Sequence, residues 1–199
     1  MSRNKIKELS DEEIADGFLK CHGNAERLML GAESLFAGGF IPLANSLLIL
    51  AVEEEVKAHM IHGVILNREL SNTLNFEPLF SKHEIKKDVA KATVWYWENF
   101  GRFIKEVGQD EILKSPEHYI LNHEVNSTGT DSENDRKIEG WLNQMPTNRE
   151  IGLYVDFRNG KWLLPSRIKT QHYKDSLQIF KLLFTVGDHI RRKFQHDVR

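Results

Sequence analysis

Near the end of the chain, two arginines and a histidine have the residue types needed to cleave RNA at its own 2′-hydroxyl. They are Arg191, Arg192 and His196. A histidine titrates near neutral pH, so it can take or give the proton of the reaction. An arginine can stabilise the extra charge that develops on the phosphorus. Arg192 and His196 are four residues apart and share a helix face, whereas Arg191 and His196 do not unless the helix bends. A basic last turn also stabilises a helix electrostatically, so a structural role stays open.

A second polar group lies on the stripe that a helix from Pro42 to about Leu70 would bury. Steps of three and four residues along this helix give Ala44, Leu47, Ala51, Glu54, Ala58, Ile61 and Ile65. A buried carboxylate is costly unless it is paired, so we expect Glu54 to contact Lys57, Lys86 or a cation on the last helix. This network is either catalytic or structural. Lys57 has a second possible partner, because Glu53 lies four residues before it in the favourable order for a surface ion pair.

A third polar group precedes the apolar stripe of a helix predicted at 81–107. The apolar stripe consists of Ala90, Val94, Trp97 and Ile104. Its backward extension passes through Lys86 and His83, so both should face the bundle. With Glu54 they could complete an acid–base and phosphate-binding site, and Lys57, Lys86 and Lys87 are the lysines that we expect to bind phosphate or RNA. Alternatively, His83 is a neutral, hydrogen-bonded residue near a helix start.

Metal binding is a weaker interpretation of the second helix. Glu55, His59 and His62 lie on one side of it, and His-x-x-His spacing can bind zinc or iron. The chain has no second Glu-x-x-His motif of the kind that completes a metal site in a helical bundle. Phosphate-binding glycine loops and nucleophile elbows are also absent from the sequence. We therefore expect neither a metal nor a cofactor.

The elements that must position these residues are mainly helical. Ser10-Asp-Glu-Glu13 is a capping box for a first helix that ends at Gly38-Gly39, with a possible break near Gly23. We expect a long polar loop at 114–134, a short helix at 135–143, and a hairpin insert at 152–165 around Asn159-Gly160. A last helix starts near Thr170 and runs nearly to the C-terminus. Four long helices with this small insert predict one helical bundle spanning 1–199.

Composition favours a cytoplasmic protein with an uneven charge distribution. A single cysteine, Cys21, cannot form an internal disulfide, and the most apolar stretch is too short for a bilayer span. The net charge is −2, yet residues 82–105 contain 6 basic and 3 acidic residues and residues 158–199 contain 10 and 3. If these segments meet in the fold, they form a patch for a polyanion such as RNA. Scattered, solvated charge is the alternative.

Three segments, in order, resemble the signatures of the AbiV family. Asn24-Ala-Glu-Arg-Leu28 leads through an alanine-rich stretch to Leu50-Ala-Val-Glu-Glu-Glu-Val-Lys57, which resembles that family's paired glutamates and lysine. Phe80-Ser-Lys-His-Glu-Ile-Lys86 resembles its aromatic and His-x-x-Lys signature. Arg149-Glu-Ile-Gly-Leu-Tyr-Val-Asp156, with Pro165 shortly after it, resembles the third. This chain departs from the pattern at Glu55 and Val56, where the family usually has an apolar residue and a glycine.

The resemblance implies an HEPN-like fold and a role in abortive infection, the bacterial response that limits phage spread. Many HEPN proteins are metal-independent endoribonuclease toxins with an Arg, four to six residues and a His, a pattern that Arg191 and His196 match. The resemblance also implies a homodimer and a phage-encoded activator. The leading hypothesis is therefore an endoribonuclease that arrests translation. The alternative is a non-catalytic helical dimer that blocks translation by binding RNA, a ribosomal component or a phage protein. The role of Tyr154, Val155 and Asp156 stays open between docking the hairpin and binding a partner.

Overall fold

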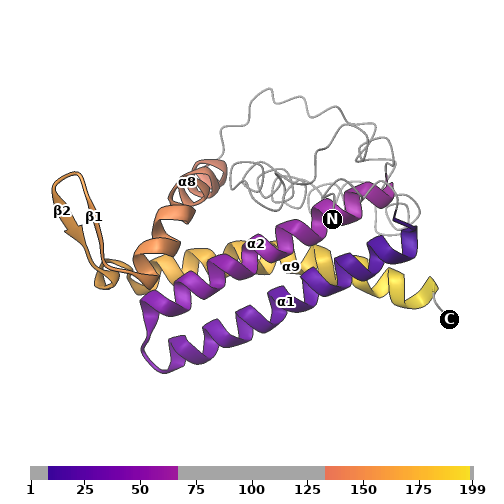
Figure 1. The fold of residues 1–199 in the computed structure, drawn as a ribbon, viewed down its shortest axis with the longest axis horizontal. Helices are drawn as coiled ribbons and strands as arrows, with labels where there is room; N and C mark the ends of the chain where they lie inside the picture. The colour runs from indigo at the N-terminus through magenta and orange to yellow at the C-terminus, as the bar shows by residue number, and fades with distance from the viewer. Residues whose placement is uncertain (1–8, 67–132, 198–199) are drawn as a thin grey trace.

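The computed structural model describes residues 9–66 and 133–197 (Figure 1). Its elements are α1 (Asp11–Ala37), α2 (Ile41–Leu66), α8 (Glu133–Leu153), β1 (Asp156–Arg158), β2 (Lys161–Leu163), the 3-10 helix η2 (Pro165–Arg167) and α9 (Thr170–Asp197). The helix expected at 81–107 lies outside the described residues, as does the loop expected at 114–134 except for its last two residues, which already belong to α8.

Helix α1 begins and ends as its sequence predicts. The backbone N–H of Ser10 donates to the Glu13 carboxylate at 2.8 Å, and the Ser10 hydroxyl accepts from the Glu13 N–H at 3.2 Å, which completes the capping box. At the other end Gly39 has φ 81, and the N–H of Phe40 donates to the carbonyl of Leu35, a Schellman arrangement. The helix is unbroken at Gly23, because one glycine costs a helix only about 1 kcal/mol.

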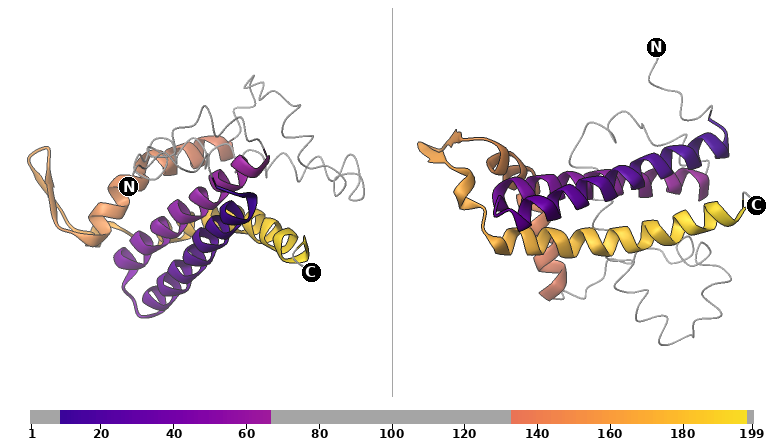
Figure 2. Two further views of the ribbon diagram at one scale, coloured as in Figure 1. Left: turned by 45° about the vertical axis from the view of Figure 1, so that its right-hand side comes forward. Right: turned by 90° about the horizontal axis from the view of Figure 1, so that it is seen from below.

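The chain then reverses into α2, which lies at the centre of the described bundle. Helix α1 packs along α2 as an antiparallel pair, α9 packs along another side of α2, and α8 contacts its N-terminal half (Figure 2). Small residues allow the close approach: a Cβ on Gly31 would come within 2.9 Å of Leu47. Because three helices cover α2, it is buried around most of its circumference and forms the core with residues such as Ala44, Leu48, Ala51, Val52 and Val56.

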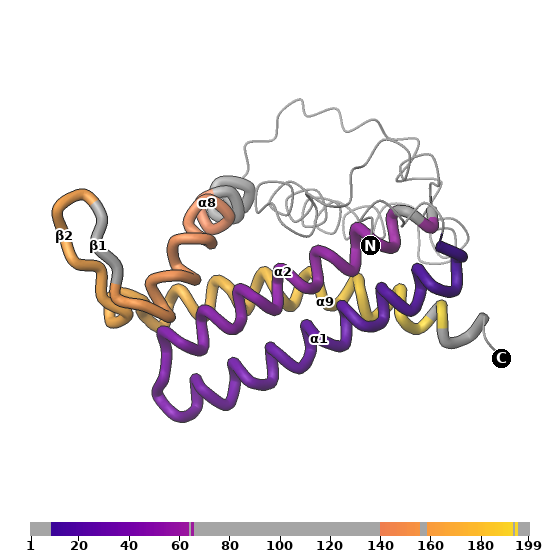
Figure 3. The backbone as a smooth tube through the Cα atoms, in the orientation of Figure 1, coloured from indigo at the N-terminus to yellow at the C-terminus, as the bar shows by residue number. Residues whose placement is uncertain are grey.

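Helix α8 and the hairpin extend from one end of this bundle. The helix expected at 135–143 is longer than predicted, continuing through Pro146 to Leu153, so the first two residues of the expected 152–165 insert are helical. Asn159 (φ 51) and Gly160 (φ 73) form the predicted turn, with Phe157 opposite Trp162 in the antiparallel register. The hairpin extends away from the helices, at the opposite end of the molecule from the C-terminal end of α9 (Figure 3).

The observed architecture is mainly helical, as predicted, with the expected hairpin before the last helix. Among the described residues, no helix is both long enough and apolar enough to cross a membrane.

Candidate functional site

The C-terminal end of α9 holds the predicted arginines in a fixed arrangement. Arg191 donates to Asp188 through Nε at 3.0 Å and through Nη2 at 2.5 Å, and Arg192 donates to the other oxygen of Asp188 at 2.5 Å. The hydrogen bond from Arg191 is the largest influence that lowers the pKa of Asp188. Asp188 therefore stays ionised and positions both guanidinium groups. Arg192 is the more exposed of the two arginines.

The helix continues beyond these arginines to Asp197. Arg192 and His196 therefore lie one helical turn apart on the same face of a regular helix, whereas Arg191 and His196 lie on different faces. This register matches the sequence prediction for an unbent helix. Arg192 rather than Arg191 is thus the arginine that shares a face with His196.

Glu54 and Lys57 form an ion pair with each other on α2. Lys57 was one of the partners expected for Glu54. The burial of Glu54 was nevertheless predicted wrongly, because Glu54 retains partial exposure while Glu55 is fully buried. A stripe drawn in steps of three and four assumes that one neighbouring helix covers α2, whereas α1, α8 and α9 all pack against it. The predicted residues His83, Lys86 and Lys87 lie outside the described residues, so their proximity to Glu54 stays a prediction.

The sequence analysis missed a buried polar cluster that joins three helices. His22 of α1 contacts both carboxylate oxygens of Glu55 through Nδ1, at 3.1 and 3.0 Å. His59, one turn after Glu55, lies 3.5 Å from the same carboxylate and donates through Nε2 to the carbonyl of Leu183 on α9 at 3.0 Å. The i, i+4 spacing of Glu55 and His59 was readable in the sequence, but nothing local indicated His22.

Glycine at position 187 makes room for this cluster on α9. A Cβ there would overlap Oε1 of Glu55 and would lie 2.8 Å from Nδ1 of His22. The imidazole of His22 is stacked on Phe184, with 4.5 Å between ring centroids. The cluster therefore anchors α9 immediately before Asp188 and the two arginines.

The buried cluster is built for packing and not for access by a substrate. Burial lowers the pKa of His59, despite the opposing charge of Glu55. His59 is therefore neutral at physiological pH, which suits its hydrogen bond to a backbone carbonyl. Nε2 of His22 is buried and has no hydrogen-bond partner among the residues that the structure describes. Within the described residues, no group of His, Cys, Asp and Glu has an arrangement that could hold a metal ion.

Two further contacts fix α8 against the bundle. Arg149 of α8 forms an ion pair with the buried Glu53 of α2 at 2.6 Å. In a separate chain of hydrogen bonds, Trp141 donates to Ser176 at 2.9 Å and Ser176 donates to Asn45 at 2.8 Å. These contacts set the position of the helix that leads into the hairpin.

The hairpin end exposes large apolar side chains. Tyr154 is 67% exposed, Val155 57% and Trp162 67%. This exposure favours partner binding over docking against the bundle for Tyr154 and Val155, the two alternatives that the sequence left open. Gly152 packs on α2, where its Cβ would lie 2.5 Å from the carbonyl oxygen of Pro42, so the apolar residues that follow it lie close to the start of α2.

Two features that were not among the predicted site residues also bear on the chemistry: the thiol of Cys21 and a second Arg-x4-His run. Burial, followed by the charge of Glu54, raises the pKa of Cys21 to about 11, so this thiol stays protonated at neutral pH and is a poor nucleophile. A second Arg-x4-His run, Arg167 to His172, was missed in the sequence. It spans the end of η2 and the first turn of α9, where Nδ1 of His172 accepts from the N–H of Lys169 at 3.0 Å.

The mainly helical fold, with its short hairpin before the last helix, is HEPN-like. A model of the family HEPN_AbiV, described as AbiV, matches residues 13–185. The chain therefore belongs to the AbiV family, whose members are HEPN-type abortive-infection proteins. No curated protein and no solved structure matches it. The matched range includes Glu54, Lys57 and the buried cluster, whereas Arg191, Arg192 and His196 lie beyond it.

Proposed function

We propose that this protein arrests translation during phage infection as a metal-independent endoribonuclease whose catalytic residues are Arg192 and His196, assisted by Arg191. The observation that carries the proposal is the regular helix at the end of α9. It keeps Arg192 and His196 one turn apart while Asp188 holds both arginines. This spacing supports a proton-transfer group one helical turn from a positive charge.

The reaction needs only RNA and water. His196 takes the proton of the 2′-hydroxyl, and the 2′-oxygen attacks the adjacent phosphorus. Arg192 and Arg191 stabilise the extra negative charge on the phosphoryl oxygens. The bond from phosphorus to the 5′-oxygen breaks, the leaving oxygen takes up a proton from water, and the proton on His196 returns to that water, which regenerates the histidine. The products are a 2′,3′-cyclic phosphate and a 5′-hydroxyl end.

The second candidate function is inhibition by binding, without cleavage. It is favoured by the family match, which ends before Arg191, and by the ion pair between Glu54 and Lys57, which occupies both side chains. In this case a homodimer or a complex with a phage-encoded activator would block translation. The exposed Tyr154 and Trp162 support a protein contact of this kind. Under the first candidate function, two further residues would assist catalysis, Glu54 and His83. Three lysines would hold phosphate: Lys57, Lys86 and Lys87.

RNA integrity in cells that express the protein, with and without phage, distinguishes these functions. We expect wild type to yield discrete fragments with 2′,3′-cyclic phosphate ends and His196→Ala to yield none. His172→Ala is the matched comparison, since it removes the histidine of the other Arg-x4-His run. Thermal unfolding of each purified variant shows whether it folds.

Three results would count against the assignment. Loss of cleavage in His172→Ala alone would move the catalytic pair to the start of α9. If only the Glu54→Ala, His83→Ala double variant loses RNA cleavage, the active site lies at Glu54 and His83, within the helical bundle, and not at the end of α9. Phage protection without any RNA fragments would favour the binding function.

A further inference from the structure

The exposed side chains of α9 all lie on one stripe, among those that the structure describes. They are Gln171, Lys174, Gln178, Lys181, Thr185, His189 and Arg192. Successive members are three or four residues apart, so they follow one face of the helix along its length. None is a carboxylate and none is apolar. The same step continues to His196, so the stripe ends at the proposed catalytic residues.

The opposite charge dominates the exposed face of α1. Its exposed ionisable residues are Asp11, Glu12, Glu13, Asp16, Lys20, Glu26, Arg27 and Glu33. The carboxylates closest in sequence to the α9 stripe are already engaged: Asp175 accepts from Gln171, and Asp188 accepts from both arginines. The bundle therefore has an acidic side that repels a polyanion and a cationic stripe that attracts one.

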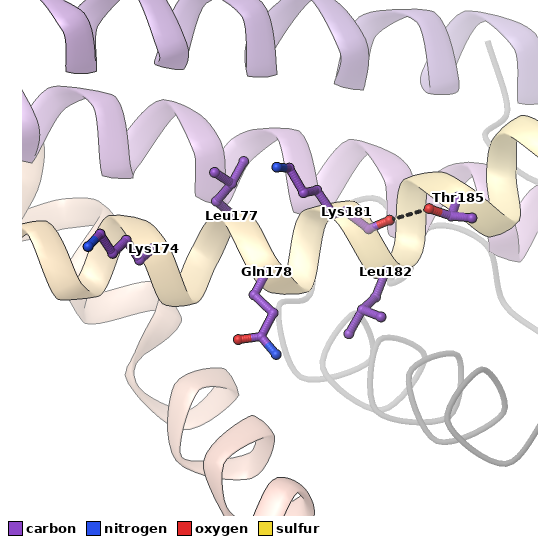
Figure 4. A pocket seen from close by; sticks show the side chains of 6 residues that line it. All are labelled: Lys174, Leu177, Gln178, Lys181, Leu182 and Thr185. Atoms are coloured by element: carbon purple, nitrogen blue, oxygen red, sulfur yellow. Dashed lines mark hydrogen bonds between the residues drawn. The ribbon is translucent and has the colours of Figure 1, made fainter. Parts of the chain in front are cut away.

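A shallow depression lies on this stripe (Figure 4). It has a volume of about 380 Å³. The lining residues within the described parts of the chain belong to α9: Lys174, Leu177, Gln178, Lys181, Leu182 and Thr185. Leu177 and Leu182 point to different sides of α9, whereas Lys174 and Lys181 lie on one face and offer charges to the backbone phosphates of a strand that follows the helix (Figure 4). Seven residues separate these lysines, which places them about 10 Å apart along the helix axis.

Positive charge also continues from the stripe toward the hairpin. Residues 158–174 contain five lysines and arginines and no aspartate or glutamate. Lys161, Arg167 and Lys169 in this segment are exposed. Exposed basic residues therefore occur on β2 and η2 as well as along α9.

We infer that this stripe, Gln171 to Arg192, is a binding track for single-stranded RNA that leads the strand to the end of α9. The inference rests on the proposed function in one respect: the track delivers RNA toward His196 only if His196 is the catalytic residue. A single strand is expected because attack by a 2′-hydroxyl needs backbone freedom that a duplex lacks.

Fluorescence anisotropy with a labelled oligouridine of about 16 nucleotides tests the track. The variant Lys174→Glu, Lys181→Glu reverses two charges on the stripe. The matched control Lys20→Glu, Arg27→Glu makes the same change in net charge on exposed residues of α1. We expect the stripe variant to bind about tenfold more weakly or worse, and its slope of log affinity against log salt to fall by about 1.4, or 0.7 for each lost phosphate contact. The control should bind within about twofold of wild type.

The inference is overturned if both variants weaken binding equally, if the stripe variant binds like wild type, or if a duplex of the same length binds more tightly than the single strand. Equal weakening would mean that only the net charge matters. The purified His196→Ala variant separates this inference from the proposed nuclease. Normal, Lys174- and Lys181-dependent binding by His196→Ala supports the track even if no cleavage is found with wild type.

Discussion

Replacing Gly187 with alanine should destabilise the protein, although alanine is the better helix former. At an unobstructed helical site the exchange stabilises by about 1 kcal/mol. At position 187 the added methyl overlaps Oε1 of Glu55, and lies 2.8 Å from Nδ1 of His22 and 3.1 Å from Cδ of Glu55. The carboxylate is fully buried and can move only by weakening its contacts with His22 and His59.

The size of the effect follows from these opposing contributions. Overpacking of a core costs about 1–3 kcal/mol. Weakening the buried hydrogen bond between His22 and Glu55 adds about 1–3 kcal/mol. After subtracting the gain in helix propensity of about 1 kcal/mol, we expect Gly187→Ala to lower the free energy of unfolding by about 1–5 kcal/mol. For a chain of this length that lowers the Tm by roughly 2–20 °C.

Urea and thermal unfolding of Gly187→Ala and of Gly23→Ala measure this difference. Gly23 also lies inside a long helix, but a Cβ there meets no atom of residues 9–66 or 133–197 within 4 Å. Gly23→Ala should therefore stabilise by up to about 1 kcal/mol. Similar stabilisation by both substitutions would refute the reasoning, because it would mean that the contact between α9 and the buried carboxylate does not constrain the fold.

Three further predictions concern other parts of the structure. The pKa of His59 is lowered in the folded state, so the unfolded chain binds more protons and stability should fall as the pH drops below about 6.5. Urea unfolding across this range should show a weaker pH dependence for His59→Gln, and an unchanged pH dependence would contradict this. Arg149→Met should cost about 1–3 kcal/mol of unfolding free energy, because it removes the guanidinium that forms an ion pair with the buried Glu53. A double-mutant cycle with Glu53→Gln should yield a coupling energy. Strict additivity of the two substitutions would argue against the ion pair. Trp162→Ser should change the unfolding free energy by less than about 0.5 kcal/mol, since the side chain is largely exposed. The same substitution should weaken self-association measured by light scattering, whereas an unchanged dimer would place the homodimer contact elsewhere.

Local sequence signals were enough to predict the helix ends and the hairpin. The capping box at Ser10, the glycines at 38 and 39, and the Asn159-Gly160 turn each act through neighbouring backbone atoms, so no knowledge of the tertiary fold is needed. The length of α8 was underestimated: the helix expected at 135–143 runs from Glu133 to Leu153 and continues through Pro146.

The site was harder to predict because it depends on which helices cover α2. Glu53, Glu54 and Glu55 are consecutive, and their burial differs only because each points toward a different neighbour. Glu53 faces Arg149 of α8, and Glu55 faces His22 of α1 and Gly187 of α9. Periodicity on one helix cannot distinguish these directions when several helices pack around it.

One of the two departures of this chain from the AbiV pattern, Glu55, has a physical explanation in the buried cluster. Glu55 lies where the family usually has an apolar residue, and a carboxylate in that position needs a hydrogen-bond partner and space. His22 supplies the partner from α1, and Gly187 supplies the space on α9. Gly187 immediately precedes Asp188, whose two oxygens hold Arg191 and Arg192. The packing that accommodates Glu55 therefore also fixes the turn of α9 that carries the arginines. Any change to His22, Glu55 or Gly187 should act on those arginines through the position of α9, without contacting RNA itself.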